Sequence, residues 1–108
     1  MPDTAKAPGP LDGVKVLDFS MFLAGPYAGR LLSDHGAEVI KIEPPGGETI
    51  RGAHPVIDGK SRYFAQLNAG KKCVVLDLKS DEGKATVRRL VAEADVVLEN
   101  FRPGVMER

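Results

Sequence analysis

Charged side chains lie at several points where apolar runs end and loops begin. Glu43 closes the run AEVIKIE, where a dinucleotide-binding fold places its ribose-binding acid, although an acid in an exposed strand-end loop is the more common arrangement. Lys79 and Arg108 carry the charge needed to bind phosphate, but single basic residues are usually solvated. Asp18 and Asp77 also end apolar runs, and a structural role suits them at least as well. These residues fit a nucleotide-like ligand and define no reaction by themselves.

Residues that could build a metal site or a nucleophilic triad are sparse. His35 and His54 lack metal-ligand spacing, and no Ser-His-Asp arrangement can be assembled around them. The single cysteine, Cys73, opens an apolar run with no base nearby in sequence, which favours an inert buried thiol. We therefore expect no metal, and the cysteine usage fits a reducing compartment, with the cytoplasm as the default location.

The bulk composition describes one globular domain without a strong electrostatic character. The 108 residues are 43% apolar and 28% charged, and 15 basic residues balance 15 acidic ones. This balance gives no footprint for nucleic acid or an anionic membrane surface, and no apolar run is long enough to span a bilayer. Residues 1–9, rich in Pro, Ala and charge, lack the apolar segment of a secretory signal and are expected to form a flexible lead-in.

Short apolar runs alternate with helical stripes from residue 14 onward. The pattern predicts strands near 14–19, 38–43, 72–77 and 96–99. Helices are expected near 26–35, started by Pro26 and ended by Gly36, and near 81–93, capped by Ser80. Strand, helix and strand in this order form βαβ units, so the predicted fold class is α/β with a Rossmann-like parallel sheet.

The loops after these strands are where such a sheet collects ligands, because its helix N-termini also lie at that edge. The four segments are Ser20 to Gly25, Glu43 to Gly47, Asp77 to Ser80 and Glu99 to Gly104. A dinucleotide fingerprint is weak, since the first loop lacks the G-x-G-x-x-G spacing. The connection over 44–70 holds three prolines and five glycines, shows only one short helix near 63–67, and is expected to be a functional loop.

Three phrases together point to a known family. They are GAEVIKIEPPGG, the pattern from Asn68 to Lys79 (NAGKKCVVLDLK) and ADVVLENFRPG. With the residues around them they closely resemble the N-terminal part of the family III CoA-transferases, the group that includes formyl-CoA transferase and carnitine CoA-transferase. The resemblance covers residues 10–108 and identifies them with the N-terminal, CoA-binding α/β segment of the large domain of a longer enzyme.

The resemblance also implies a set of CoA-binding residues. The loop at Phe22, Leu23 and Ala24 matches the family's site where CoA and the acyl group meet. The others are Leu76 and Lys79 near the adenosine end of CoA and Arg108 near its phosphates. Two positions depart from the family: Pro44 stands where a basic CoA contact is frequent, and Leu23 stands where some members have Gln, so formyl-CoA or oxalate chemistry is unsupported.

The implied function is transfer of CoA from an acyl-CoA donor to a carboxylic acid through an aspartyl thioester. In the family that aspartate lies beyond the position of Arg108, so the 108 residues alone are expected to be inactive. The resemblance implies an interlocked homodimer, with coenzyme A and acyl-CoA as substrates. Two alternatives stay open: an α-methylacyl-CoA racemase, which shares the fold, and a CoA- or nucleotide-binding module without catalysis.

Overall fold

The structure, a computed structural model, describes residues 9–106. Most of the predicted lead-in (residues 1–8) and Arg108 lie outside the described residues. The chain forms β1 (Lys15–Asp18), α1 (Ala24–Asp34), β2 (Glu38–Glu43), the 3₁₀ helix η1 (Thr49–Gly52), β3 (Val56–Ile57), β4 (Lys60–Ser61), α2 (Arg62–Leu67), β5 (Lys72–Val75), α3 (Asp81–Glu93) and β6 (Val96–Leu98). The expected α/β class is confirmed, and so are the predicted strands and the helices to within a few residues.

The main sheet has the order β5-β2-β1-β6, and all its strands are parallel. Leu17 of β1 lies opposite Ile40 of β2 on one side and Val97 of β6 on the other. From β1, the next two strands along the chain, β2 and β5, are added in turn on one side. The chain then crosses back and places β6 on the other side of β1. The strand order therefore reverses between β1 and β6, a point where open α/β sheets commonly have a crevice.

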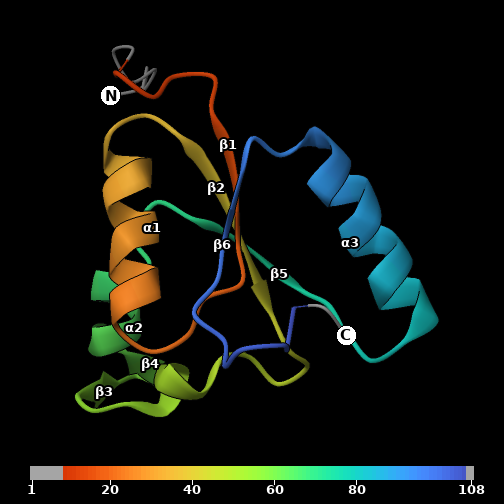
Figure 1. Ribbon diagram of the computed structural model, residues 1–108. Coiled ribbons are helices and arrows are strands. Elements are labelled where there is room, and N and C mark those ends of the chain that lie inside the picture. The colour runs from red at the N-terminus through yellow and green to blue at the C-terminus, as the bar shows by residue number, and fades with distance from the viewer. Residues whose placement is uncertain (1–8, 107–108) are drawn as a thin grey trace.

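One helix covers each face of this sheet, with α1 on one side and α3 on the other (Figure 1). Alternate residues of β1 point to opposite faces, so Val16 packs with Val39 and Leu32 beneath α1. Leu17 and its neighbours pack beneath α3 in a second cluster, which contains Phe19, Ile42, Val87 and Leu90. Burial on both faces explains why the central strands are largely apolar on both faces instead of alternating between apolar and polar residues.

The connection between β2 and β5 contains more regular structure than the sequence predicts. The short helix is confirmed as α2, whose N-terminus is capped by the Ser61 hydroxyl accepting from Phe64 N at 3.1 Å. The 3₁₀ helix η1 and the antiparallel hairpin β3–β4 were not predicted. Strands of two residues carry no detectable alternation, and only Asp58 and Gly59, both at positive φ, mark their turn.

The first helix begins earlier than Pro26. Its first residue is Ala24, so Pro26 lies within the first turn, where its missing N–H has no intrahelical partner in any case. Phe22 adopts φ 68°, an uncommon conformation for a side chain of that size, and reverses the chain just before the helix. At the other end Gly36 adopts φ 107°, which agrees with its predicted role as the helix stop. No helix within residues 9–106 is long and apolar enough to cross a bilayer.

Candidate functional site

A cavity of about 330 Å³ opens at the carboxyl ends of the parallel strands. All four of the predicted loop segments contribute to it, represented by Ser20, Pro44, Lys79 and Phe101. The remaining lining residues are Phe19, Met21, Ile42, Glu43, Pro45, Glu48, Leu76, Asp77 and Leu78. Because most of these walls are apolar, the cavity suits a flat or hydrophobic group whose polar end reaches the rim.

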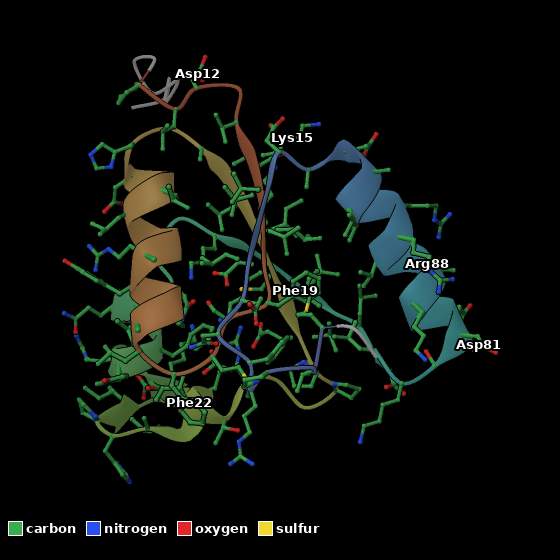
Figure 2. All side chains as sticks on the ribbon, viewed as in Figure 1. Asp12, Lys15, Phe19, Phe22, Asp81 and Arg88 are labelled. Atoms are coloured by element: carbon green, nitrogen blue, oxygen red, sulfur yellow. The ribbon has the colours of Figure 1, made fainter. Side chains whose placement is uncertain are left out.

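The structure brings together only part of the predicted CoA-binding set. Leu76 and Lys79 line the cavity. Phe22, Leu23 and Ala24 are not among its lining residues; Phe22 and Leu23 are 53% and 54% exposed where α1 begins. Figure 2 shows this separation, with Phe19 in the middle of the molecule and Phe22 beside the N-terminal end of α1. The role of each of these residues toward CoA stays a prediction.

Several cavity residues were not singled out from the sequence. Phe19 directly follows β1 and Ile42 belongs to β2, and their positions in the wall depend on how far each strand extends before its loop. Glu48 lies in the long connection, just before η1, a helix that the sequence did not predict. The available signal was the location of the loops, which identified the correct edge of the sheet and not the individual side chains.

A chain of buried polar groups fixes the loop after β1. The carboxylate of Asp18 accepts hydrogen bonds from the Ser20 backbone N at 2.8 Å and from the Ser20 hydroxyl. Its other oxygen lies 2.7 Å from Lys71 Nζ, and both side chains of this ion pair are fully buried. Gly29 of α1 permits this packing, since a Cβ there would lie 2.6 Å from Asp18 Oδ2. Asp18 therefore has the structural role that the sequence left open.

The same loop is held from the β2 side by Lys41. Its buried ammonium donates to Ser20 O at 2.9 Å and lies 2.9 Å from Glu48 Oε1. Glu48 Oε1 has no hydrogen-bond partner among the described residues, so its contact with Lys41 is an ion pair without hydrogen-bond geometry. Glu48 Oε2 accepts from Ile50 N at 3.1 Å and caps η1. The charge of Glu48, which lines the cavity, is thus balanced by the buried ammonium of Lys41.

Glu43 is buried, so the expected exposed strand-end acid is wrong. Arg51 donates to it twice, from Nε at 2.6 Å and from Nη2 at 2.8 Å, and Glu48 N donates at 2.9 Å. The Arg51 guanidinium also stacks on the ring of Phe64, 3.9 Å from its centroid. The turn at Pro44 and Pro45 carries the chain back over the strand end, and this brings Arg51 onto the carboxylate. Glu43 is therefore already paired and has a structural role in this fold.

The Glu43–Arg51 pair predicts an acid-dependent loss of stability. Hydrogen bonds from Arg51 outweigh burial and lower the pKa of Glu43 from 4.5 to about 2. A carboxyl pKa lowered by folding stabilises the protein above the unfolded value, and this stabilisation is lost as pH falls from 4.5 toward 2. At about 1.4 kcal/mol per pKa unit the limit is about 3 kcal/mol, and solvent screening of half-exposed Arg51 reduces it to about 2 kcal/mol.

Urea unfolding between about pH 6 and pH 2.5 measures this loss. The Arg51→Met variant should show a shallower decline than the unchanged protein, because its Glu43 no longer gains from ionisation in the folded state. Parallel pH profiles for the two proteins would contradict the assignment.

Lys79 is the exposed positive charge at the cavity rim. The Asp77 carboxylate accepts from its backbone N at 2.9 Å, which fixes the turn before α3, and Ser80 caps that helix through Gly83 N at 2.9 Å. Asp81 and Glu82 place negative charge in the first turn of α3. The helix terminus is thus occupied by acids, and the Lys79 ammonium is the group at this rim suited to an anion such as phosphate.

Cys73 is exposed on β5, so the expectation of a buried thiol is wrong. Because β5 is an edge strand, its side chains are covered less than those of β1 and β2. Partial desolvation, followed by the charge of nearby Glu43, raises the pKa of the Cys73 thiol, so it is not activated as a thiolate. Within residues 9–106 no group of three or more His, Cys, Asp or Glu side chains could hold a metal ion.

The fold and the cavity define a parallel α/β domain with an apolar cavity at the carboxyl ends of its strands. The sequence model of CoA-transferase family III matches residues 11–108. The chain belongs to this family, as the resemblance predicted.

Curated relatives support the assignment and are much longer than this chain. The succinyl-CoA–D-citramalate CoA-transferase of Chloroflexus aurantiacus is 50% identical over 105 residues, which cover 94% of this chain and 26% of that protein. The probable fatty acyl-CoA transferase Rv3272 of Mycobacterium tuberculosis is 50% identical over 108 residues, or 97% and 27% of the two chains. The chain thus spans about a quarter of the length of these relatives.

Solved structures agree with the fold. A crystal structure of a mutant of Rv3272 from Mycobacterium tuberculosis matches with a TM-score of 0.86 at 51% identity, over 94% of this chain and 28% of that chain. A CAIB/BAIF family protein from Brucella suis matches with a TM-score of 0.87 at 44% identity, over the same shares.

Proposed function

We propose that this chain is the N-terminal, CoA-binding part of an enzyme that moves CoA from an acyl-CoA donor to a carboxylic acid acceptor. The observation that carries the proposal is the cavity at the carboxyl edge of the sheet, which contains Leu76 and Lys79 in a chain of this family. Similar proteins are named as CoA-transferases acting with succinyl-CoA, acetyl-CoA, citramalate, oxalate and mesaconate. The substrates in these names are of two kinds, an acyl-CoA and a free carboxylate.

In this proposal the cavity takes the nucleotide end of CoA. Leu76 contributes to the apolar wall, and Lys79 at the rim pairs with a phosphate or holds the adenine edge. Arg108 supplies a second basic contact near the phosphates. The strand order, with its reversal beside β1, is the one in which nucleotide-binding sheets of the Rossmann type bind their ligands. This agreement supports the nucleotide end, rather than the acyl end, as the occupant of the cavity.

The thioester end then extends toward the loop at Phe22, Leu23 and Ala24. Ping-pong transfer between a thioester and an acid requires a carboxylate nucleophile. The carboxylate displaces the CoA thiolate from the donor and forms a mixed anhydride. The thiolate then attacks the enzyme carbonyl of this anhydride, which gives the enzyme thioester and releases the donor's free acid. We assign that role to an aspartate outside residues 1–108, because Asp18 is consumed by its ion pair with Lys71. A homodimer, which rests on the family resemblance, and a cytoplasmic location, which rests on the single cysteine and the lack of an apolar signal segment in residues 1–9, complete the proposal.

Alanine at Lys79 or at Arg108 should weaken CoA binding by the complete protein. A charge-assisted contact is worth about 1.5–3 kcal/mol, so the dissociation constant should rise roughly tenfold to a hundredfold. Isothermal titration with CoA measures the change, and Lys84→Ala on α3, outside the cavity lining, is the matched control. An unchanged constant in either variant would remove that residue from the site.

Turnover distinguishes the proposal from its alternatives. The complete protein should form a new acyl-CoA from a donor thioester and a free carboxylic acid, whereas residues 1–108 alone should not. Deuterium exchange next to the thioester without transfer would indicate a racemase, and CoA binding without either reaction would indicate a binding module. Transfer by the 108-residue chain, confirmed by intact mass, would place the nucleophile within it.

A further inference from the structure

β1 and the edge strand β6 separate at the point where the strand order reverses. Their backbone ladder ends with the hydrogen bond from Phe19 N to Leu98 O at 2.8 Å. Beyond this hydrogen bond, the segment after β1 turns toward α1 and the segment after β6 continues to Phe101. Both Met21 and Phe101 line the cavity. A gap therefore lies between these two segments where the strands diverge.

A side-chain amide bridges this gap. Asn100 Oδ1 accepts from Met21 N at 2.9 Å, and Asn100 Nδ2 donates to Met21 O at 2.8 Å. A primary amide has the same donor and acceptor pair as a peptide group, so Asn100 extends the ladder by one rung after the strands diverge. Both bonds join segments 79 positions apart in sequence. An ionised Asp of the same length offers acceptors only and could not donate to Met21 O.

The surroundings are built around this amide. Gly25 lies close to it, and a Cβ at that position would be 3.2 Å from Asn100 Nδ2. Phe22, next to Met21, adopts φ 68°, a conformation that persists only where its neighbours hold it. Ser20, on the other side, is fixed by Asp18 and Lys41. Among the described residues, Asn100 is the only one at or after β6 that forms hydrogen bonds with residues 20–24.

We propose that Asn100 is a positioning residue for the loop at 21–24. By holding both polar groups of Met21, it fixes the place from which Phe22 turns back into α1 and so sets the loop that carries Leu23 and Ala24. It acts through this loop and not through the nucleotide end of the cavity. The expected effect on catalysis rests on the proposed function. The fixed position of the loop rests only on the two hydrogen bonds of Asn100.

Two variants of the complete protein test the role. Asn100→Ala removes both bonds, and Asn100→Asp keeps the size and the acceptor while replacing the donor with an oxygen that faces Met21 O. Both should lower kcat at least tenfold for a donor and acceptor pair that the unchanged protein uses. The dissociation constant for CoA should change less than threefold, because Leu76 and Lys79 are untouched. The control is Glu99→Gln, which keeps the acceptor for Phe101 N and should leave both quantities unchanged.

A second measurement is independent of catalysis. Hydrogen exchange of the backbone N–H groups in residues 20–24 should accelerate at least tenfold in Asn100→Ala, with exchange in β2 and α3 unchanged. If exchange accelerates in this loop in a protein that shows no transferase activity, the positioning role stands and the proposed function fails. Unchanged exchange in the loop, unchanged kcat in an active protein, or a joint loss of kcat, CoA affinity and thermal stability would overturn the inference.

Discussion

Replacing Lys71 with methionine is expected to lower the free energy of unfolding by about 3–5 kcal/mol. The Lys71 ammonium is fully buried and donates to Asp18 Oδ2 at 2.7 Å, Asn68 Oδ1 at 2.8 Å and Pro26 O at 2.9 Å. Methionine has a similar length and leaves the Asp18 carboxylate buried without its counter-charge. Burial lowers the pKa of Lys71 despite the opposing effect of Asp18, which agrees with a strongly desolvated ion pair.

The adjacent lysine provides a matched control. Lys72 pairs with Glu38 at 2.8 Å, but the two side chains are 70% and 40% exposed. An ion pair in solvent contributes little, so Lys72→Met should cost less than about 1 kcal/mol. Urea unfolding at neutral pH measures the free energy of unfolding of each variant relative to the unchanged protein. Equal losses for Lys71→Met and Lys72→Met would show that the Asp18–Lys71 pair does not hold β1 to the segment before β5.

Periodicity was sufficient to predict the four strands and their parallel direction. Val16 and Leu17 point to opposite faces, and each is covered by a helix, which is the condition under which strands become continuous apolar runs. The carboxyl edge followed from the same pattern, because four strands in parallel bring their loops to one place. The cavity lies at this edge, and its walls include residues of all four loops.

Side-chain pairing could not be predicted in the same way. Whether Glu43 is solvated or buried depends on the path of the chain through Pro44 and Pro45 and on the arrival of Arg51 eight positions later. The partners of Asp18 and Met21 lie 53 and 79 positions away, and nothing local in the sequence indicates them. The exposure of Cys73 follows from the position of β5 at the edge of the sheet, which the strand pattern alone does not determine.

Gly25 links the stability of the fold to the geometry of the site. Replacing it with alanine is expected to cost about 2–4 kcal/mol, although alanine normally favours a helix. The new Cβ would lie 2.2 Å from the Ser20 Cβ and 2.7 Å from its hydroxyl oxygen, and it would also approach Asn100 Nδ2. Ser20 cannot move aside without breaking its bonds to Asp18 and Lys41, so the strain falls on the loop that carries Phe22.

Thermal unfolding of the complete protein measures this cost, and Gly52→Ala is the control. Gly52 ends η1 with no atom within 4 Å of an added Cβ, so its replacement should be neutral or slightly stabilising. The two variants also differ in their expected chemistry. Gly25→Ala should lower kcat together with stability, because it displaces Ser20 and Asn100, which hold Met21 from either side, whereas Gly52→Ala should retain full activity. Unchanged thermal unfolding and unchanged turnover in Gly25→Ala would contradict this prediction, because they would show that the loop after β1 accommodates the added Cβ without displacing Ser20 or Asn100.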